Sequence, residues 1–129
     1  MHVKYLITSL ALCLAVAAPA LADPVATAQA AAVQRLQARL PVKVNKVTTL
    51  VSVVAVGRMA KYSFQMSVPR TRVPARWHLL QKAKLIKDAC GKPAVRKLMK
   101  DGAMYSYMYT DVKSRYVAEI RVKDSDCPK

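Results

Sequence analysis

Strict alternation of apolar and polar side chains marks the middle of this chain as β-structure. In Arg58–Val68, the residues Tyr62, Phe64, Met66 and Val68 alternate with polar residues, a pattern typical of a strand with one buried face. The preceding residues, 47–56, are dense in valine and threonine and are predicted to form a second strand. A glycine at position 57 separates the two segments, so we expect a hairpin.

The C-terminal part predicts another hairpin. Ala103–Thr110 and Tyr116–Lys123 both alternate, and residues 111–115 form a turn between them. In the first strand Tyr105, Tyr107 and Tyr109 alternate with methionine and serine. Because methionine is also a common core residue, the sequence leaves two orientations open. The tyrosines either face outward as an aromatic binding surface or face inward as part of the core.

Three segments have helical spacing. Asp23–Leu40 has apolar residues three and four positions apart and ends before Pro41. Ala75–Cys90 follows the proline-bounded loop Pro69–Pro74, and Ala94–Asp101 is a short third helix that ends at a glycine. Spacings of four, three and four predict that the buried stripe of the second helix is Leu79, Ala83, Ile86 and Cys90.

The order of these elements is helix, strand, strand, helix, helix, strand, strand. Two hairpins connected through helices favour an α+β fold. We predict a two-layer sandwich in which a four-stranded antiparallel sheet carries the helices on one face.

The start of the chain is typical of a secretory signal peptide. A short basic segment precedes the apolar run Leu6–Val16, and small residues follow before Asp23. The apolar run is too short to span a bilayer. We therefore predict cleavage after Ala22, which would remove Cys13 with the leader. Residues 23–129 would then be a single periplasmic or secreted domain without a membrane span.

Two cysteines remain after this cleavage, Cys90 and Cys127. An even pair in an exported protein most simply forms one disulfide, since the compartment is oxidising. Two unpaired buried thiols are the alternative. No C-x-x-C spacing indicates a redox site.

The chain is strongly basic. It has 22 Lys and Arg against seven Asp and Glu, a net charge of +15, and only Lys4 of these lies in the predicted leader. From Arg58 to Lys100 there are twelve basic residues and one acidic residue, Asp88. Such a field attracts acidic partners and polyanions. A solvated basic surface that only keeps the protein soluble is the alternative.

Few residues suit catalysis or metal binding. After the leader the chain has one histidine, His78, and one glutamate, Glu119, and no serine lies in a nucleophile motif. We expect His78 on the helix surface. One histidine and two bridged cysteines cannot fill a zinc site, and no glycine-rich phosphate loop is present. We therefore predict a protein that is not an enzyme and that holds neither metal nor cofactor.

Binding is the remaining chemistry. Three arginines lie in and just after the proline-bounded loop, beside a helix N-terminus, where they favour a phosphate, sulfate or carboxylate. An ordinary solvated loop, with Trp77 as a packing lid, is the alternative. The predicted binding residues are Arg70, Arg72, Arg76, Trp77, Lys84, Lys87, Tyr105, Tyr107 and Tyr109.

The mature part also resembles a known kind of protein. The positions that carry the resemblance are Leu40-Pro41, Thr48–Leu50, Val53–Gly57, Tyr62, Cys90, Gly102, Tyr105–Tyr109 and Cys127. With them the chain resembles small exported bacterial proteins of uncharacterised function. The resemblance implies the fold and the location and carries no activity.

These observations predict an exported, non-enzymatic basic protein that binds an acidic protein partner in the cell envelope. It would act as an accessory factor, an inhibitor or an immunity protein. Direct binding of lipopolysaccharide, anionic lipid or extracellular nucleic acid is the alternative, and an envelope enzyme is a third hypothesis. The predicted leader argues against intracellular nucleic acid as a partner.

Overall fold

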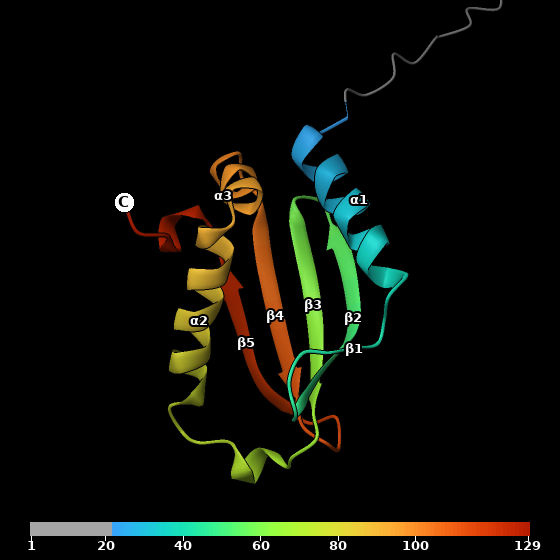
Figure 1. The fold of residues 1–129 in the computed structure, drawn as a ribbon, viewed down its shortest axis with the longest axis vertical. Coiled ribbons are helices and arrows are strands. Elements are labelled where there is room, and N and C mark those ends of the chain that lie inside the picture. Colours follow the sequence, from blue (N-terminus) through green and yellow to red (C-terminus); the bar gives the residue numbers. More distant parts are fainter. Residues whose placement is uncertain (1–21) are drawn as a thin grey trace, which may run out of the picture.

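A computed structural model describes residues 22–129 (Figure 1). The elements in chain order are α1 (Pro24–Gln37), β1 (Val42–Lys43), β2 (Thr48–Val56), β3 (Met59–Met66), the 3₁₀ helix η1 (Arg70–Arg72), α2 (Trp77–Gly91), α3 (Pro93–Lys100), β4 (Met104–Thr110), β5 (Tyr116–Val122) and the 3₁₀ helix η2 (Asp124–Asp126). The predicted leader, Cys13 included, lies outside the described residues except for Ala22. Within residues 22–129, no helix has the length and apolar character that crossing a bilayer requires.

The sheet has the strand order β1-β2-β3-β4-β5. Neighbouring strands are antiparallel except β3 and β4, which are parallel. The prediction of an α+β fold is confirmed, but the prediction of a four-stranded antiparallel sheet is wrong. The connection from β3 to β4 contains α2 and α3 and is long enough to return the chain to the starting end of β3, so the two strands run in the same direction. The short strand β1, which pairs with Leu50 and Thr49, was not predicted.

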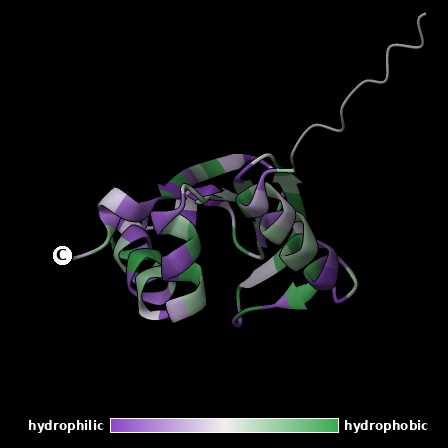
Figure 2. Ribbon diagram, turned by 90° about the horizontal axis from the view of Figure 1, so that it is seen from above, coloured by the Kyte–Doolittle hydropathy of each residue, from purple (hydrophilic) through white to green (hydrophobic). Residues whose placement is uncertain are grey.

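A single core fills the space between the sheet and the helices. Helix α1 packs on β2 and β3, and α2 packs on β5. Figure 2 shows α1 and α2 standing apart from one another on this side of the sheet. The buried apolar residues of the core are Val25, Val33, Leu50, Val53, Ala60, Phe64, Met66, Ala89, Met99, Ala103, Tyr105, Tyr109, Ile120, Val122 and Cys127.

Polar side chains hold α1 on the sheet. The Asp23 carboxylate caps the helix by accepting hydrogen bonds from the backbone N–H groups of Val25 and Ala26, and it also pairs with Arg58 at 2.7 Å. Gln29, in the middle of the buried face, donates its Nε2–H to the carbonyls of Arg58 and Met104. These bonds link α1 to residues next to β3 and β4, and they fix the position of the helix along the sheet.

The buried side of α2 differs from the predicted stripe. Leu79 is 57% exposed and Ala83 is also exposed, whereas Trp77, Leu85 and Ala89 pack against the core. The observed stripe has a spacing of four and includes the polar residue at position 81, so an apolar pattern alone did not reveal it. Ile86 and Cys90, which were predicted to be buried, are partly buried at the edge of this side.

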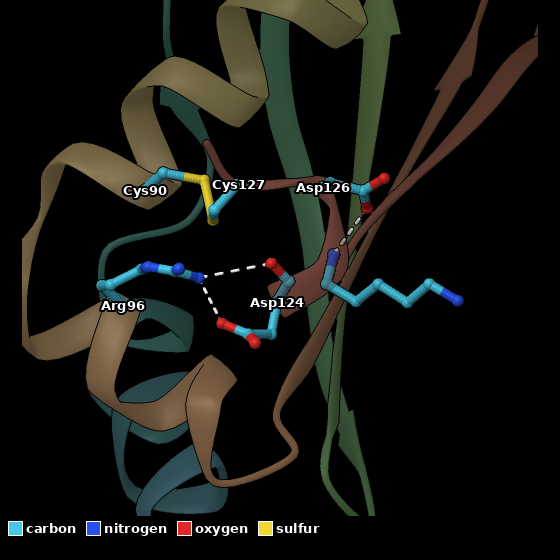
Figure 3. The surroundings of a disulfide bond; sticks show 6 residues. Cys90, Arg96, Asp124, Asp126 and Cys127 are labelled. Carbon is cyan, nitrogen blue, oxygen red and sulfur yellow. Dashed lines mark hydrogen bonds and ion pairs between the residues drawn. A yellow bond between two sulfur atoms is a disulfide. The ribbon is translucent and has the colours of Figure 1, made fainter. Parts of the chain in front are cut away.

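A disulfide connects the end of α2 to the C-terminal tail (Figure 3). It joins Cys90 to Cys127, as the sequence predicted. Close to it, Arg96 of α3 forms an ion pair with Asp124 of η2 and donates a second hydrogen bond to the backbone carbonyl of the same residue. The tail is therefore attached to both α2 and α3.

One buried carboxylate organises the opposite end of the molecule. Asp111, which follows β4, is fully buried and accepts hydrogen bonds from the backbone N–H groups of Arg70, Lys113 and Arg115. The Arg115 guanidinium also donates to it at 2.9 Å. Burial by itself raises the pKa of Asp111, but these donors outweigh it and hold the pKa well below the usual range of a carboxyl group. The ionised side chain thus ties the β4–β5 turn to η1.

We expect the disulfide to contribute strongly to stability. The bridge spans 37 positions, and closing a loop of this length in the unfolded chain corresponds to about 3–4 kcal/mol in the chain-entropy model. The double variant Cys90→Ser, Cys127→Ser should lose about this free energy of unfolding in urea denaturation. Wild-type protein with its disulfide reduced should unfold at the same urea concentration as the variant. An unchanged midpoint in both samples would contradict the expectation.

Asp111→Asn should lower the melting temperature by several degrees at neutral pH. The amide presents an NH₂ group where the carboxylate now accepts hydrogen bonds, so donors of Arg70 or Arg115 lose their partner. The folded pKa lies below that of the unfolded chain, so the stabilisation is complete above about pH 4 and is lost as the pH falls further. The difference between wild type and variant should therefore shrink on acidification.

The measurement is a series of thermal unfolding curves from neutral to acidic pH. The matched control is Asp101→Asn, since Asp101 is exposed and its carboxylate makes no ion pair with another described residue. A variant as stable as wild type at neutral pH would contradict the role of Asp111.

Candidate partner-binding groove

A groove with an aromatic floor and a lining of both apolar and polar side chains lies on the helical side of the sheet. It consists of two adjoining cavities of about 310 and 320 Å³, which share the lining residues Val44, Phe64, Leu85 and Asp88. One wall is α2, and Val44, just after β1, lies on the other. The groove therefore runs between α2 and the β1 edge of the molecule, over the middle strands of the sheet.

Aromatic rings from β3 and β4 form the floor of the groove. The parallel register pairs Tyr62 with Tyr107 and Phe64 with Tyr109. The rings of the first pair are stacked with centroids 5.2 Å apart, and those of the second are stacked at 4.9 Å. Tyr105 extends this surface toward α3 and is buried, while Tyr107 is half-buried. The floor is thus a row of rings held side by side by strand pairing.

The wall formed by α2 packs directly on this floor. Trp77 meets Tyr109 edge to face, with ring centroids 4.8 Å apart. One turn further along the helix, Gln81 donates its Nε2–H to the Tyr109 hydroxyl at 2.9 Å. Leu85 and Ala89 follow on the same side of the helix. On the opposite wall, Val44 is half exposed, so part of the apolar lining is open to solvent.

The electrostatics of the floor keep it neutral. Burial raises the pKa of Tyr62, Tyr105 and Tyr109 above the usual value of a phenol. The effect is largest at Tyr107, where the neighbouring phenols and the negative charge of Asp88 raise the pKa further. All four hydroxyls stay protonated at physiological pH. Charges occur only at the rim, where α2 and its C-cap contribute Lys84, Asp88 and Lys92.

The structure brings some of the predicted binding residues together. Trp77, Lys84, Tyr105, Tyr107 and Tyr109 all line the groove. The tyrosines therefore face the helices, which settles the orientation that the sequence left open. They are reached from the groove and not from the outer face of the sheet.

The other predicted binding residues lie outside the groove. Arg70 and Arg72 are in η1, Arg76 directly precedes α2, and Lys87 is on the exposed side of α2. All four are exposed, as is His78. Their role in binding stays a prediction. Among residues 22–129, no cluster of three His, Cys, Asp or Glu side chains could hold a metal ion.

Sequence reasoning missed the residues that give the groove its shape. Tyr62 and Phe64 were recognised only as the apolar face of a strand. Leu85 and Asp88 were missed because the predicted buried stripe of α2 is displaced by one or two positions from the side of the helix that packs on the sheet. Nothing in the local sequence marks Val44, which reaches the groove only because β1 pairs with β2.

Comparisons with known proteins identify relatives of the fold. No protein-family model and no curated protein matches the amino-acid sequence. Two similar solved structures are pilotins of type 2 secretion systems. EpsS of Vibrio vulnificus has 14% identity, a TM-score of 0.68 and coverage of 81% of this chain and 93% of its own. AspS of Vibrio cholerae has 14% identity, a TM-score of 0.64 and coverage of 80% and 92%.

A third similar structure is a secreted protein of Pseudomonas aeruginosa. Its identity is 16% and its TM-score 0.65, with coverage of 83% of this chain and 99% of its own. At these identities the likeness shows the fold, which this chain shares over most of its length with two pilotins and a secreted protein.

These findings correct the predicted function. The expectation of a protein whose basic charge binds an acidic partner or polyanions is wrong, and so are the predicted roles of inhibitor and immunity protein. The chain has the fold of secretion-system pilotins, and the recess between α2 and Val44 has a floor of aromatic rings. The arginines on which the charge argument rested lie elsewhere.

Trp77 makes the groove easy to observe, because it is the only tryptophan of the chain. We expect the apolar dye anilinonaphthalene sulfonate to bind the native protein and to accept energy from Trp77. Val44→Gln should weaken dye binding about threefold. The side chain of Val44 is half exposed, so its replacement removes roughly half of the free energy that a fully buried valine contributes.

The matched control is Val56→Gln, because Val56 is similarly exposed but does not line the groove. Fluorescence titration of the three proteins measures the difference. Equal dye affinity in all three would show that the dye, and hence the accessible apolar surface, is elsewhere.

Proposed function

We propose that this protein is a pilotin-like accessory protein of a bacterial envelope secretion system. In this function it binds a helical segment of a protein of that system in the groove between α2 and Val44. The observation that carries the proposal is the groove itself, an accessible recess over a floor of stacked aromatic rings with Leu85 and Val44 at its sides. The protein acts by binding and not by catalysis.

The shape of the groove favours a helix as its occupant. Helices α1 and α2 pack on different strands of the same side of the sheet. A partner helix lying over Phe64 and Tyr107 would be a third helix in this layer. Its apolar residues, spaced three and four positions apart, would contact the rings, Leu85 and Val44. Tryptophan and tyrosine are the residue types that most often dominate the energy of such interfaces.

The fold supports the same proposal. Both pilotins are matched over more than nine-tenths of their own length, so this chain has nearly all of the elements that they have. The predicted signal peptide, with cleavage after Ala22, would bring the chain to the periplasm, where an envelope secretion system assembles. The disulfide between Cys90 and Cys127 fits an oxidising compartment.

The proposal predicts a secretion defect. Deleting the gene in its source bacterium should strongly reduce the amount of type 2 secretion substrates in the culture medium, and wild-type protein should restore it. Val44→Lys should fail to restore secretion, because it places a charge on the apolar wall of the groove. Quantitative mass spectrometry of the medium measures the effect.

Val56→Lys is the matched control, since it adds the same charge at a similarly exposed valine outside the groove. Both variants should be exported and should melt at the temperature of wild type. Normal secretion in the deletion strain would contradict the proposed function. Full rescue by Val44→Lys would show that the groove is not the site used.

A further inference from the structure

Alternating charges line the α2 side of the groove. Lys84, Asp88 and Lys92 all contribute to its lining. They are four residues apart along α2 and its C-cap. This spacing is about one helical turn, or about 6 Å along the axis. The rim therefore presents positive, negative and positive charges in a row beside the aromatic floor.

These three charges are available to a partner. All three side chains are exposed, and none of them takes part in an ion pair among residues 22–129. Lysine before aspartate, as in Lys84 and Asp88, is the less favourable order for a pair within a helix, and Asp88 and Lys92, which have the favourable order, form no ion pair either. Asp88 also lines both cavities of the groove, next to Tyr109 in one and Tyr107 in the other. The acid is thus directed to the groove although the surrounding sequence is basic.

We infer that the groove selects a partner helix with an acidic, a basic and an acidic side chain at four-residue spacing beside its apolar stripe. This inference rests on the proposed function and specifies the partner. A helix lying alongside α2 would place these side chains opposite Lys84, Asp88 and Lys92, with one pair per turn. Because the row of charges reads the same in both directions, it fixes the register of the partner helix and not its polarity.

This partner differs from a uniformly acidic one. Asp88 would repel an acidic residue placed opposite it. A helix with carboxylates at all three positions would therefore lose, at Asp88, part of the favourable electrostatic energy that it gains beside the two lysines. The apolar contacts provide most of the affinity, and the charges discriminate between helices that are equally apolar. Three partly exposed pairs correspond to roughly a tenfold difference in affinity at low salt, and the difference falls as salt rises.

Synthetic amphipathic peptides test the inference directly. All of them carry leucine and isoleucine at heptad spacing, and they differ only in three flanking residues. These residues are Glu-Lys-Glu, Lys-Glu-Lys or Glu-Glu-Glu, with compensating charges on the far face to keep the net charge equal. Fluorescence anisotropy with the mature protein, exported to the periplasm of an expression host and purified from it, measures the affinity. We expect Glu-Lys-Glu to bind tightest, about tenfold tighter than Lys-Glu-Lys at low salt.

A charge-swapped protein gives the reciprocal result. The triple variant Lys84→Glu, Asp88→Lys, Lys92→Glu should prefer the Lys-Glu-Lys peptide by a similar factor. The exposure of all three positions allows the fold to be kept, and a melting curve checks this. The matched control is Lys87→Glu, because Lys87 is exposed on the same helix and does not line the groove. It should keep the preference of wild type.

The possible failures are distinguishable. Equal affinity for the Glu-Lys-Glu and Lys-Glu-Lys peptides, unchanged in the triple variant, would overturn the charge register and leave the groove as a helix site. Tightest binding of Glu-Glu-Glu would overturn it in favour of simple attraction to acidic segments. If no peptide binds, both the register and the proposed use of the groove for a helix are overturned.

Discussion

The parallel pairing of β3 and β4 is the constraint on which the rest of the structure depends. Two neighbouring parallel strands cannot be joined by a tight turn, so the chain between them must cross over the sheet. This crossover contains η1, α2 and α3. It carries α2 to the edge strand β5, whereas α1 packs on β2 and β3 of the same face of the sheet. The aromatic residues of the central strands then lie beside α2, where a groove remains between this helix and Val44.

The same pairing determines what the groove can bind. In the parallel register Tyr62 is beside Tyr107, and Phe64 is beside Tyr109, so that the rings stack across the strands. Stacked rings have little freedom to move, and a surface that is already ordered loses less entropy when a partner binds. The Tyr109 hydroxyl, at the α2 wall, accepts a hydrogen bond from Gln81. The floor therefore offers an apolar surface without an unpaired polar group at this contact.

The sequence predicted which face of a strand is buried better than it predicted which strands pair in the sheet. Alternation in Arg58–Val68 identified the apolar face correctly, and the disulfide was correctly predicted from two cysteines in a chain expected to be exported. The pairing of the strands could not be predicted in this way. An alternation of apolar and polar residues indicates which side chains of a strand share a face, but it does not indicate which other strand pairs with it. The parallel β3–β4 pair and the two-residue strand β1 could not be predicted for that reason. The groove depends on both.

For recognition by the groove, the positions of the charged residues are more important than the overall basic composition of the chain. The excess of basic residues from Arg58 to Lys100 predicted an acidic partner, with Asp88 as an isolated exception. In the structure, α2 packs Trp77, Leu85 and Ala89 against the core. This orientation places Asp88 in the lining of the groove, whereas most of the basic residues lie outside the groove. The sequence did not predict this orientation of α2, because the residue at position 81 on the packed side is polar. Because charges act on a bound partner mainly over short distances at physiological salt, the few that line the groove matter more for recognition than the net charge.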